Sequence, residues 1–209
     1  MSYPTRVKAV SEACDDALVR HGFKRLRRHS VAWEFSQEFL GWIGLNVGNY
    51  PTHVQINPFV GIHCVPLEKF VQEIRGNKYK LGDITTYAVH LGEVCPEGLG
   101  GFLFPEGSDI EPVAERLAVA VRQHGVPYMQ TLASYEALLP HLRERESMLG
   151  GYPERVAVCL VLLDRQSEAL AYLDAKLAEY QKNPRYSEVQ ARWQHFSDSL
   201  RQRMEKSAG

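Results

Sequence analysis

The stretch that decides the fold is residues 31–62, VAWEFSQEFLGWIGLNVGNYPTHVQINPFVGI, in which apolar and polar residues alternate in successive runs. A period of two is typical of β-strands, because successive side chains point to opposite faces of a sheet. The turn-forming sequence GNYP at 48–51 separates two of the runs. Short links between alternating strands predict an antiparallel meander with one covered face. Pro58 lies inside the last run, which predicts that this strand is an edge strand or contains a bulge.

Helical periodicity surrounds these strands. Apolar residues recur at helical spacing in the segments 4–21, 66–75 and 110–124. Asp109 is expected to cap the last of these helices, and Gly125 and Pro127 are expected to end it.

The region between these helices is less regular. Residues 85–94 alternate again and predict a further strand. Residues 92–107 hold five glycines and two prolines in sixteen positions. Such a composition predicts a long ordered loop or a broken strand.

From residue 134 onward the chain has helical periodicity throughout. The expected helices cover 135–146, 153–163, 169–180 and 187–204. Residues 156–163 are apolar on all sides, which predicts a buried helix. The pair at 153–181 resembles a single hairpin of the tetratricopeptide type. We therefore predict an α+β protein, with an antiparallel meander of about 4–6 strands flanked by helices in a core domain at 1–130 and a helical region at 131–209 packed on that core.

Composition excludes several classes of protein. The chain has 209 residues, and 24 Lys and Arg against 25 Asp and Glu give a net charge of −1, which argues against nucleic-acid binding driven by overall charge. The N-terminal segment lacks the apolar core of a signal peptide, and no apolar run approaches the roughly 20 residues that span a bilayer. The four cysteines lie 31 or more residues apart, so neither a disulfide framework nor a CxxC metal site is expected. These features predict a cytoplasmic protein without a membrane partner.

No segment carries a decisive catalytic motif. A G-x-S-x-G nucleophile turn is absent from the sequence. The glycines at 98–101 do not lead into a helix with Lys and Ser or Thr, as a phosphate-binding loop requires. His63, Cys64, His90 and Cys95 lack the local pairing of a zinc motif. We expect no catalytic residue, no metal and no cofactor.

The distribution of charge is more informative. Residues 81–115 contain seven acids and no Lys or Arg, whereas residues 17–33 contain five bases and no acid. An acidic segment that includes a glycine-rich loop is suited to receive a basic partner protein. Alternatively, the two segments neutralise one another across the sheet. In the first case Phe102 or Phe104 would be an apolar anchor, and the candidate partner-binding residues are Glu93, Glu97, Phe102, Phe104, Glu106, Asp109 and Glu111.

Three short motifs carry a resemblance to a known family. They are LVRHGFKR at 18–25, WEF at 33–35 and IGLNVG at 43–48. This pattern resembles an uncharacterised bacterial α+β domain family, in which a helix ending in GFK precedes an antiparallel meander, over about the first 125 residues. Some members resemble immunity proteins encoded beside polymorphic toxins, and the resemblance implies such a role here.

The leading hypothesis is a non-enzymatic binding protein, most concretely an immunity protein that occludes a cognate antibacterial toxin with a basic surface. A second hypothesis is a small-ligand-binding protein or enzyme with a pocket on the uncovered sheet face, lined by Trp42, Asn46, Gln55 and Asn57. A third is an adaptor that binds its partner through the C-terminal helical hairpin.

Overall fold

The computed structural model describes residues 3–27, 30–95, 101–148, 152–182 and 186–207. The chain forms two compact units. The first consists of Met1–Val65 and Lys80–Ala133, and the second of Pro66–Tyr79 and Ser134–Gly209. The second unit therefore takes in residues 66–79, which the expected division at residue 130 placed in the core domain.

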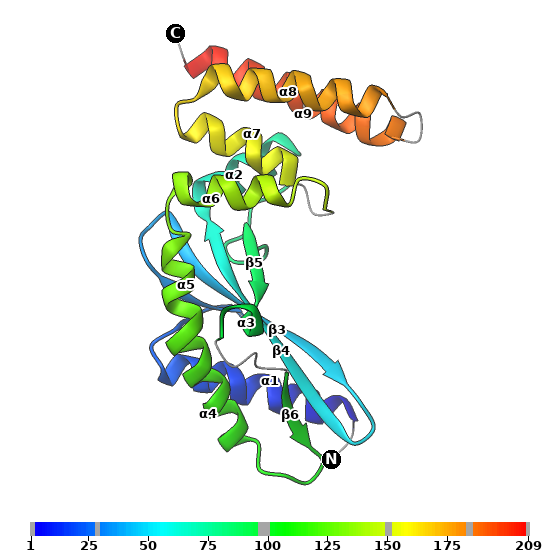
Figure 1. Ribbon diagram of the computed structural model, residues 1–209. Coiled ribbons are helices and arrows are strands. Elements are labelled where there is room, and N and C mark those ends of the chain that lie inside the picture. Colours follow the sequence, from blue (N-terminus) through cyan, green and yellow to red (C-terminus); the bar gives the residue numbers. More distant parts are fainter. Residues whose placement is uncertain (1–2, 28–29, 96–100, 149–151, 183–185, 208–209) are drawn as a thin grey trace. The chain divides into compact units, whose positions relative to one another are not determined.

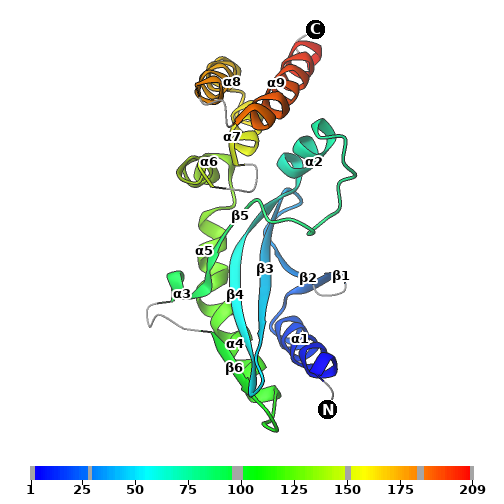
Figure 2. The same cartoon turned by 90° about the vertical axis from the view of Figure 1, so that its right-hand side faces the viewer.

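The first unit is built on an antiparallel sheet, as the alternating runs predicted. Its strands are β1 (Lys24–Arg27), β2 (Ser30–Glu34), β3 (Phe39–Asn49), β4 (His53–Cys64), β5 (Tyr87–His90) and β6 (Phe102–Pro105). Their order is β1-β2-β3-β4-β5, with β6 also paired to β4. Figure 2 shows β3 and β4 as one long hairpin, drawn in blue and cyan, that runs the length of α4 and α5. The predicted α+β class is confirmed.

The helices of this unit are α1 (Tyr3–Arg20), α3 (Leu91–Val94), α4 (Glu111–Ala120) and α5 (Val126–Thr131). The side chain of Met129 on α5 lies against Gly41, and Gly125 lies against Val60. Ile43 and Val60 are register partners on β3 and β4, and both are buried on this face. The apolar residues of the alternating runs thus form the core beneath α5.

Pro58 shows how a proline is accommodated inside a sheet. The expectation of an edge strand or a bulge is wrong, because β4 pairs with β3 on one side and with β5 and β6 on the other. The amide of Thr86 donates to the carbonyl of Ile62, so even-numbered residues of β4 direct their backbone groups toward β5 and β6. β6 pairs with 53–56 and β5 pairs with 59–62. The N–H that Pro58 lacks therefore falls in the gap between these two partners.

The helix expected to end at Gly125 continues past it, which corrects that prediction. A π-helical turn, Val121–Gly125, joins α4 to α5, and the three form the continuous green rod of Figure 1. Proline inside a helix lacks an N–H and clashes with the preceding turn, and a local change of helix type relieves both problems. Pro127 lies in the first turn of α5, where no such N–H is required.

Two smaller predictions about element ends also need correction. The strand expected at 85–94 ends at His90, because the His90 side chain caps the short helix α3 by accepting a hydrogen bond from the amide of Gly92. Asp109 accepts a hydrogen bond from the amide of Glu111, but the residue at the N-cap position of α4 is Ile110.

The second unit consists of helices α2 (Val65–Ile74), α6 (Tyr135–Glu144), α7 (Tyr152–Leu162), α8 (Gln166–Gln181) and α9 (Ser187–Ser207). Helices α6 to α9 pack in chain order, each on the next, which confirms the predicted C-terminal helical region. Helix α7 is buried from Val156 to Leu160, as its apolar sequence predicted, whereas the last part of the predicted buried stretch, 161–163, is half-buried. Of the helices that the structure describes, none combines the length and the hydropathy of a membrane-spanning helix.

Candidate functional site

The residues of the acidic segment belong to several different elements of the first unit. Glu93 is exposed and accepts a hydrogen bond from the amide of His90. Glu106 and Asp109 are exposed in the connection between β6 and α4, and Glu111 begins α4. Glu97 lies outside the described residues.

Part of the acidic segment is neutralised within the unit. The guanidinium of Arg20, at the end of α1, lies 3.1 Å from Glu111 and 3.2 Å from Glu115. His21 also contacts Glu115, and together His21 and Arg20 hold the pKa of that carboxyl below its usual range. Within the basic segment, Arg25 pairs at 2.6 Å with Asp16 of α1. For Glu111 and Glu115, the alternative in which the two charged segments neutralise each other therefore fits the structure.

The remaining acids do not form a single cluster. Glu93 follows β5, which ends opposite Phe59, whereas Glu106 follows β6, which ends opposite His53. Six residues of β4 separate these positions, a span of about 20 Å at the usual rise of a strand. No cation pairs with Glu93 or Glu106 in the part of the chain that the structure describes.

The apolar-anchor role expected of Phe102 and Phe104 is wrong. Both side chains are buried, Phe104 completely, because they alternate inward on β6 opposite Ile56 and Val54. Leu103 between them points outward and is 50% exposed. Neither phenylalanine is accessible to a partner in this fold.

The sheet face opposite Met129 and Val60 has an unusual composition. Strands β3, β4, β5 and β6 contain no Asp, Glu, Lys or Arg at all. Exposed positions of soluble proteins are normally rich in these residues. We call this surface the open face and define it by six side chains that are half-buried or exposed, namely Trp42, Asn46, Gln55, Asn57, Phe59 and His90.

Glycines allow aromatic rings to lie flat on the open face. An added Cβ at Gly44 would come within 2.3 Å of the Trp42 ring, and one at Gly48 within 2.9 Å of the Tyr50 ring. The indole N–H of Trp42 donates to the carbonyl of Gly82 at 3.2 Å, which fixes the ring. Large side chains at the two glycines would push both rings off the sheet.

Further contacts order the rest of this surface. The amide of Gln55 donates to Asn57 Oδ1 at 3.0 Å. The rings of Phe59 and His90 meet edge to face with centroids 5.5 Å apart. At the end of the hairpin, Tyr50 and His53 stack at 4.7 Å.

The sequence analysis had already placed Trp42, Asn46, Gln55 and Asn57 on one uncovered face. The structure puts all four on the same face of β3 and β4 and joins Gln55 to Asn57. Phe59 and His90 were not included. Phe59 could have been found, because it continues the period of two from Gln55 and Asn57, whereas the approach of His90 depends on the pairing of β5 with β4.

The histidines and cysteines of the described part of the chain do not gather into a metal site. Among the residues that the structure describes, no three His, Cys, Asp or Glu side chains are placed to hold a metal ion. His63 is buried, and its ring contacts the carbonyl of Ile84 at 2.6 Å. All four cysteines are buried, and burial raises the pKa of Cys14 and Cys159 to about 12, which keeps both thiols protonated.

In the second unit, the structure shows charged groups that sequence reasoning missed. Arg155 and Glu68 form a buried ion pair with Nε 2.6 Å from Oε1. Lys176 lies between Glu146 and Glu179, at 2.8 Å and 2.9 Å. Lys176 and Glu179 are three residues apart on α8, a spacing that local reasoning could have found. Glu68 with Arg155 and Glu146 with Lys176 come from segments far apart in the chain, so no local spacing indicates that they pair.

Comparison with family models, curated proteins and solved structures gave no match to this chain. The family resemblance described above therefore stays a prediction.

Proposed function

We propose that this chain is a non-enzymatic binding protein, and specifically a cytoplasmic immunity protein that neutralises a cognate antibacterial toxin by occluding it. The observation that carries the proposal is the open face, whose six side chains are aromatic or amide groups without a formal charge. Lys24 and Glu34, which lie on the same side of β1 and β2, pair with each other. The centre of a protein–protein interface is depleted of charged residues and enriched in aromatic ones.

The position of the open face supports recognition of a protein. Its residues lie on paired strands rather than on loops, so little conformational entropy is lost when a partner binds. Asn46 is exposed, while Trp42 and Phe59 are half-buried and present ring surface. Amide groups both donate and accept hydrogen bonds, which suits them to the polar atoms of a partner backbone.

The acids that remain unpaired support a basic partner. Glu93 and Glu106 follow the edge strands β5 and β6, about 20 Å apart along β4. They would form an acidic rim beside the uncharged centre, and rim charges steer association more than they add affinity. Tyr50, which is 45% exposed, lies at the same end of the hairpin as Glu106.

Co-expression with the protein encoded beside this chain tests the proposal. We expect the two proteins to co-purify. We also expect this chain to restore the growth of cells that produce the neighbouring protein, which is the expected toxin. Asn46→Arg, which inserts a charge on the open face opposite Asn57, should weaken binding by about tenfold or more, or 1.4 kcal/mol. Gln123→Arg is the matched control, because Gln123 is an exposed residue of the π-helical turn on the helical side of the sheet, and it should leave binding unchanged.

The rim is tested separately by salt dependence. Glu93→Lys with Glu106→Lys should slow association and reduce its sensitivity to ionic strength. Absence of binding together with absence of protection would refute the immunity role. A metabolite or nucleotide that raises the melting temperature of the wild type but not of Asn46→Arg would instead support the small-ligand hypothesis.

A further inference from the structure

The second unit contains a cavity of about 370 Å³ that the proposed function does not use. Residues of α7, α8, α9 and the segment after α6 line it, including Glu146, Glu179, Tyr180, Val189, Arg192 and Trp193. Pockets of roughly 300–1,000 Å³ are typical of sites for small molecules.

One part of the wall carries excess negative charge. Lys176 Nζ lies 2.8 Å from Glu146 and 2.9 Å from Glu179, so a single cation serves two carboxylates. The Lys176 side chain is 13% exposed, that of Glu146 is 20% exposed and that of Glu179 is 60% exposed. Burial, with the charges of Glu179 and Glu146, raises the pKa of the nearby Tyr180 phenol, although Lys176 opposes the shift. A net charge of −1 remains at this acidic end.

Another part of the wall carries excess positive charge. Arg192 lines the cavity from α9, and no hydrogen bond or ion pair to it occurs among the described residues. Two nearby carboxylates are already engaged, Glu154 with Arg75 and Glu68 with Arg155. Glu188 lies one helical turn before Arg192 on α9, and no ion pair joins the two among the described residues. Burial and the positive charges of Arg155 and Arg192 lower the pKa of Arg75, which Glu68 partly offsets. This basic end would gain from an anionic group.

Apolar surface completes the cavity. The Tyr180 ring meets Trp193 edge to face at 6.0 Å and Tyr186 at 6.2 Å. Val189, Arg192 and Trp193 are spaced i, i+3 and i+4 along α9, so they share one face of that helix. Tyr186 is 46% exposed and therefore accessible from solvent.

We propose that this cavity binds a small zwitterion of the amino-acid or dipeptide class. Its ammonium group pairs with Glu146 and Glu179, its carboxylate pairs with Arg192, and its apolar side chain lies against Tyr180 and Trp193. A ligand with only a positive charge would leave Arg192 unpaired, and a ligand with only a negative charge would leave the excess carboxylate unpaired. The site is independent of the open face.

Calorimetric titration of the full chain with phenylalanine and two analogues tests the proposal. Phenylalaninamide keeps the ammonium group only, and 3-phenylpropionate keeps the carboxylate only. We expect phenylalanine to bind about tenfold or more tightly than either analogue. Glycyl-phenylalanine is compared with phenylalanine to distinguish a dipeptide site from an amino-acid site. The zwitterion that binds more tightly identifies the class of ligand that the cavity prefers.

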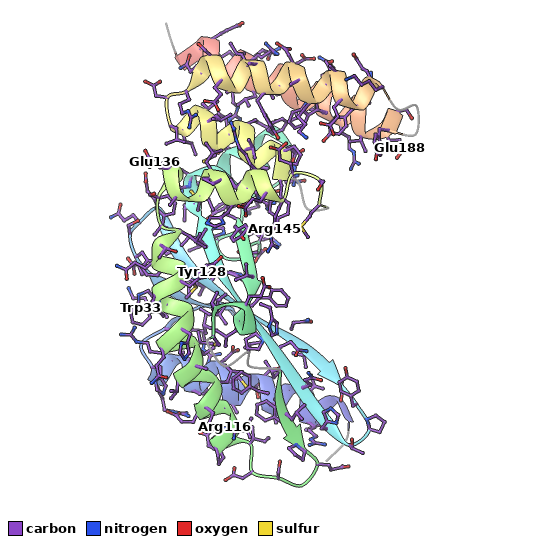
Figure 3. The ribbon with its side chains drawn as sticks, in the orientation of Figure 1. Trp33, Arg116, Tyr128, Glu136, Arg145 and Glu188 are labelled. Atoms are coloured by element: carbon purple, nitrogen blue, oxygen red, sulfur yellow. The ribbon has the colours of Figure 1, made fainter. Side chains whose placement is uncertain are left out.

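Two variants test which residue binds the carboxylate of the ligand and which binds its ammonium group. Arg192→Gln should bind phenylalanine and phenylalaninamide equally, and Glu179→Gln should bind phenylalanine and 3-phenylpropionate equally. Arg116→Gln on α4 and Glu136→Gln on α6 are the controls, since both residues are exposed and neither lines the cavity (Figure 3). Equal binding of phenylalanine and phenylalaninamide by the wild type would overturn the proposal. So would the absence of binding by all twenty amino acids and the dipeptide at about 10 mM, a concentration that detects even a Kd of about 1 mM.

Discussion

At the scale of the residue, the most consequential contact is the ion pair of Arg155 with Glu68. Arg155 lies in the most apolar helix of the chain, yet its side chain is only 5% exposed and that of Glu68 only 1%. The guanidinium contacts both carboxylate oxygens, Nε at 2.6 Å and Nη2 at 3.2 Å. Such two-pronged geometry offsets the cost of removing both charges from water only while both partners are present.

Removal of one partner should therefore be costly. We expect Glu68→Gln to lower the free energy of unfolding by about 3–5 kcal/mol, because it leaves the Arg155 charge buried and unpaired. Urea denaturation measures the loss. The double variant Glu68→Leu with Arg155→Met should recover most of it. Asp174→Asn, which removes an exposed partner of Arg201, should cost no more than about 1 kcal/mol. A similar loss of unfolding free energy in Glu68→Gln and Asp174→Asn would contradict this account.

At the scale of the element, the rod of α4, the π-helical turn and α5 determines how the helical layer meets the sheet. Trp33 lies beside this rod, where the guanidinium of Arg122 stands 4.2 Å from the ring (Figure 3). Gly125 is the point of closest approach, because an added Cβ would come within 2.9 Å of Val60 Cγ1. The glycine is needed for close contact with β4 rather than for ending a helix.

Because of this close contact, we expect Gly125→Ala to lower the stability of the protein, although the same change usually stabilises a helix. In an exposed helix the change would stabilise the protein by about 1 kcal/mol. Here we expect it to destabilise the protein by about 1–3 kcal/mol, because the methyl group overpacks the contact with Val60. Adding Val60→Ala should remove much of the clash, whereas Gln123→Ala, on the exposed side of the same turn, should be nearly neutral. Thermal unfolding monitored by circular dichroism measures the stability of all three variants. A higher melting temperature for Gly125→Ala would show that the contact between Gly125 and Val60 is loose.

At the scale of the whole molecule, the two units are not contiguous in the chain. Residues 66–79 belong with the C-terminal helices. Three ion pairs join this segment to α7 and α9: Glu68 with Arg155, Glu73 with Arg203, and Arg75 with Glu154. Leu67, Val71 and Ile74 on the same segment are buried.

This arrangement predicts the result of truncation. A chain ending at residue 133 should aggregate, because it exposes the apolar side of α2 and leaves its charges without partners. The same truncation with 66–79 replaced by a Gly/Ser linker of equal length should be monomeric and keep the near-ultraviolet circular dichroism of the first unit. Size-exclusion chromatography separates the two outcomes. Equal behaviour of the two truncated chains would contradict the grouping of 66–79 with the helices.

Local patterns predicted much of the fold and part of the candidate site. The alternation around Trp42 and Gln55 predicted both the strands and the uncovered face, since strand periodicity depends only on neighbouring residues. Local reasoning failed at Pro58, where the missing N–H falls in the gap between β5 and β6 and costs no hydrogen bond. It also failed at Gly125, which does not end the helix but allows close contact with Val60. It also failed for Phe104, whose burial follows from pairing with β4.

The amino-acid sequence alone determined most of the strands and helices and which side of each one is apolar, because these properties arise from periodicities of a few residues. It did not determine the short elements α3, α5 and β6. Only the tertiary structure decided which charges meet. Arg155 reaches Glu68 across 87 residues, and Arg20 reaches Glu115 across 95. The cavity beside Arg192 likewise exists only where three helices converge, so its charge pattern cannot be seen in any one of them. Such contacts depend on packing between segments that are distant in the chain, and local residue spacing does not predict that packing.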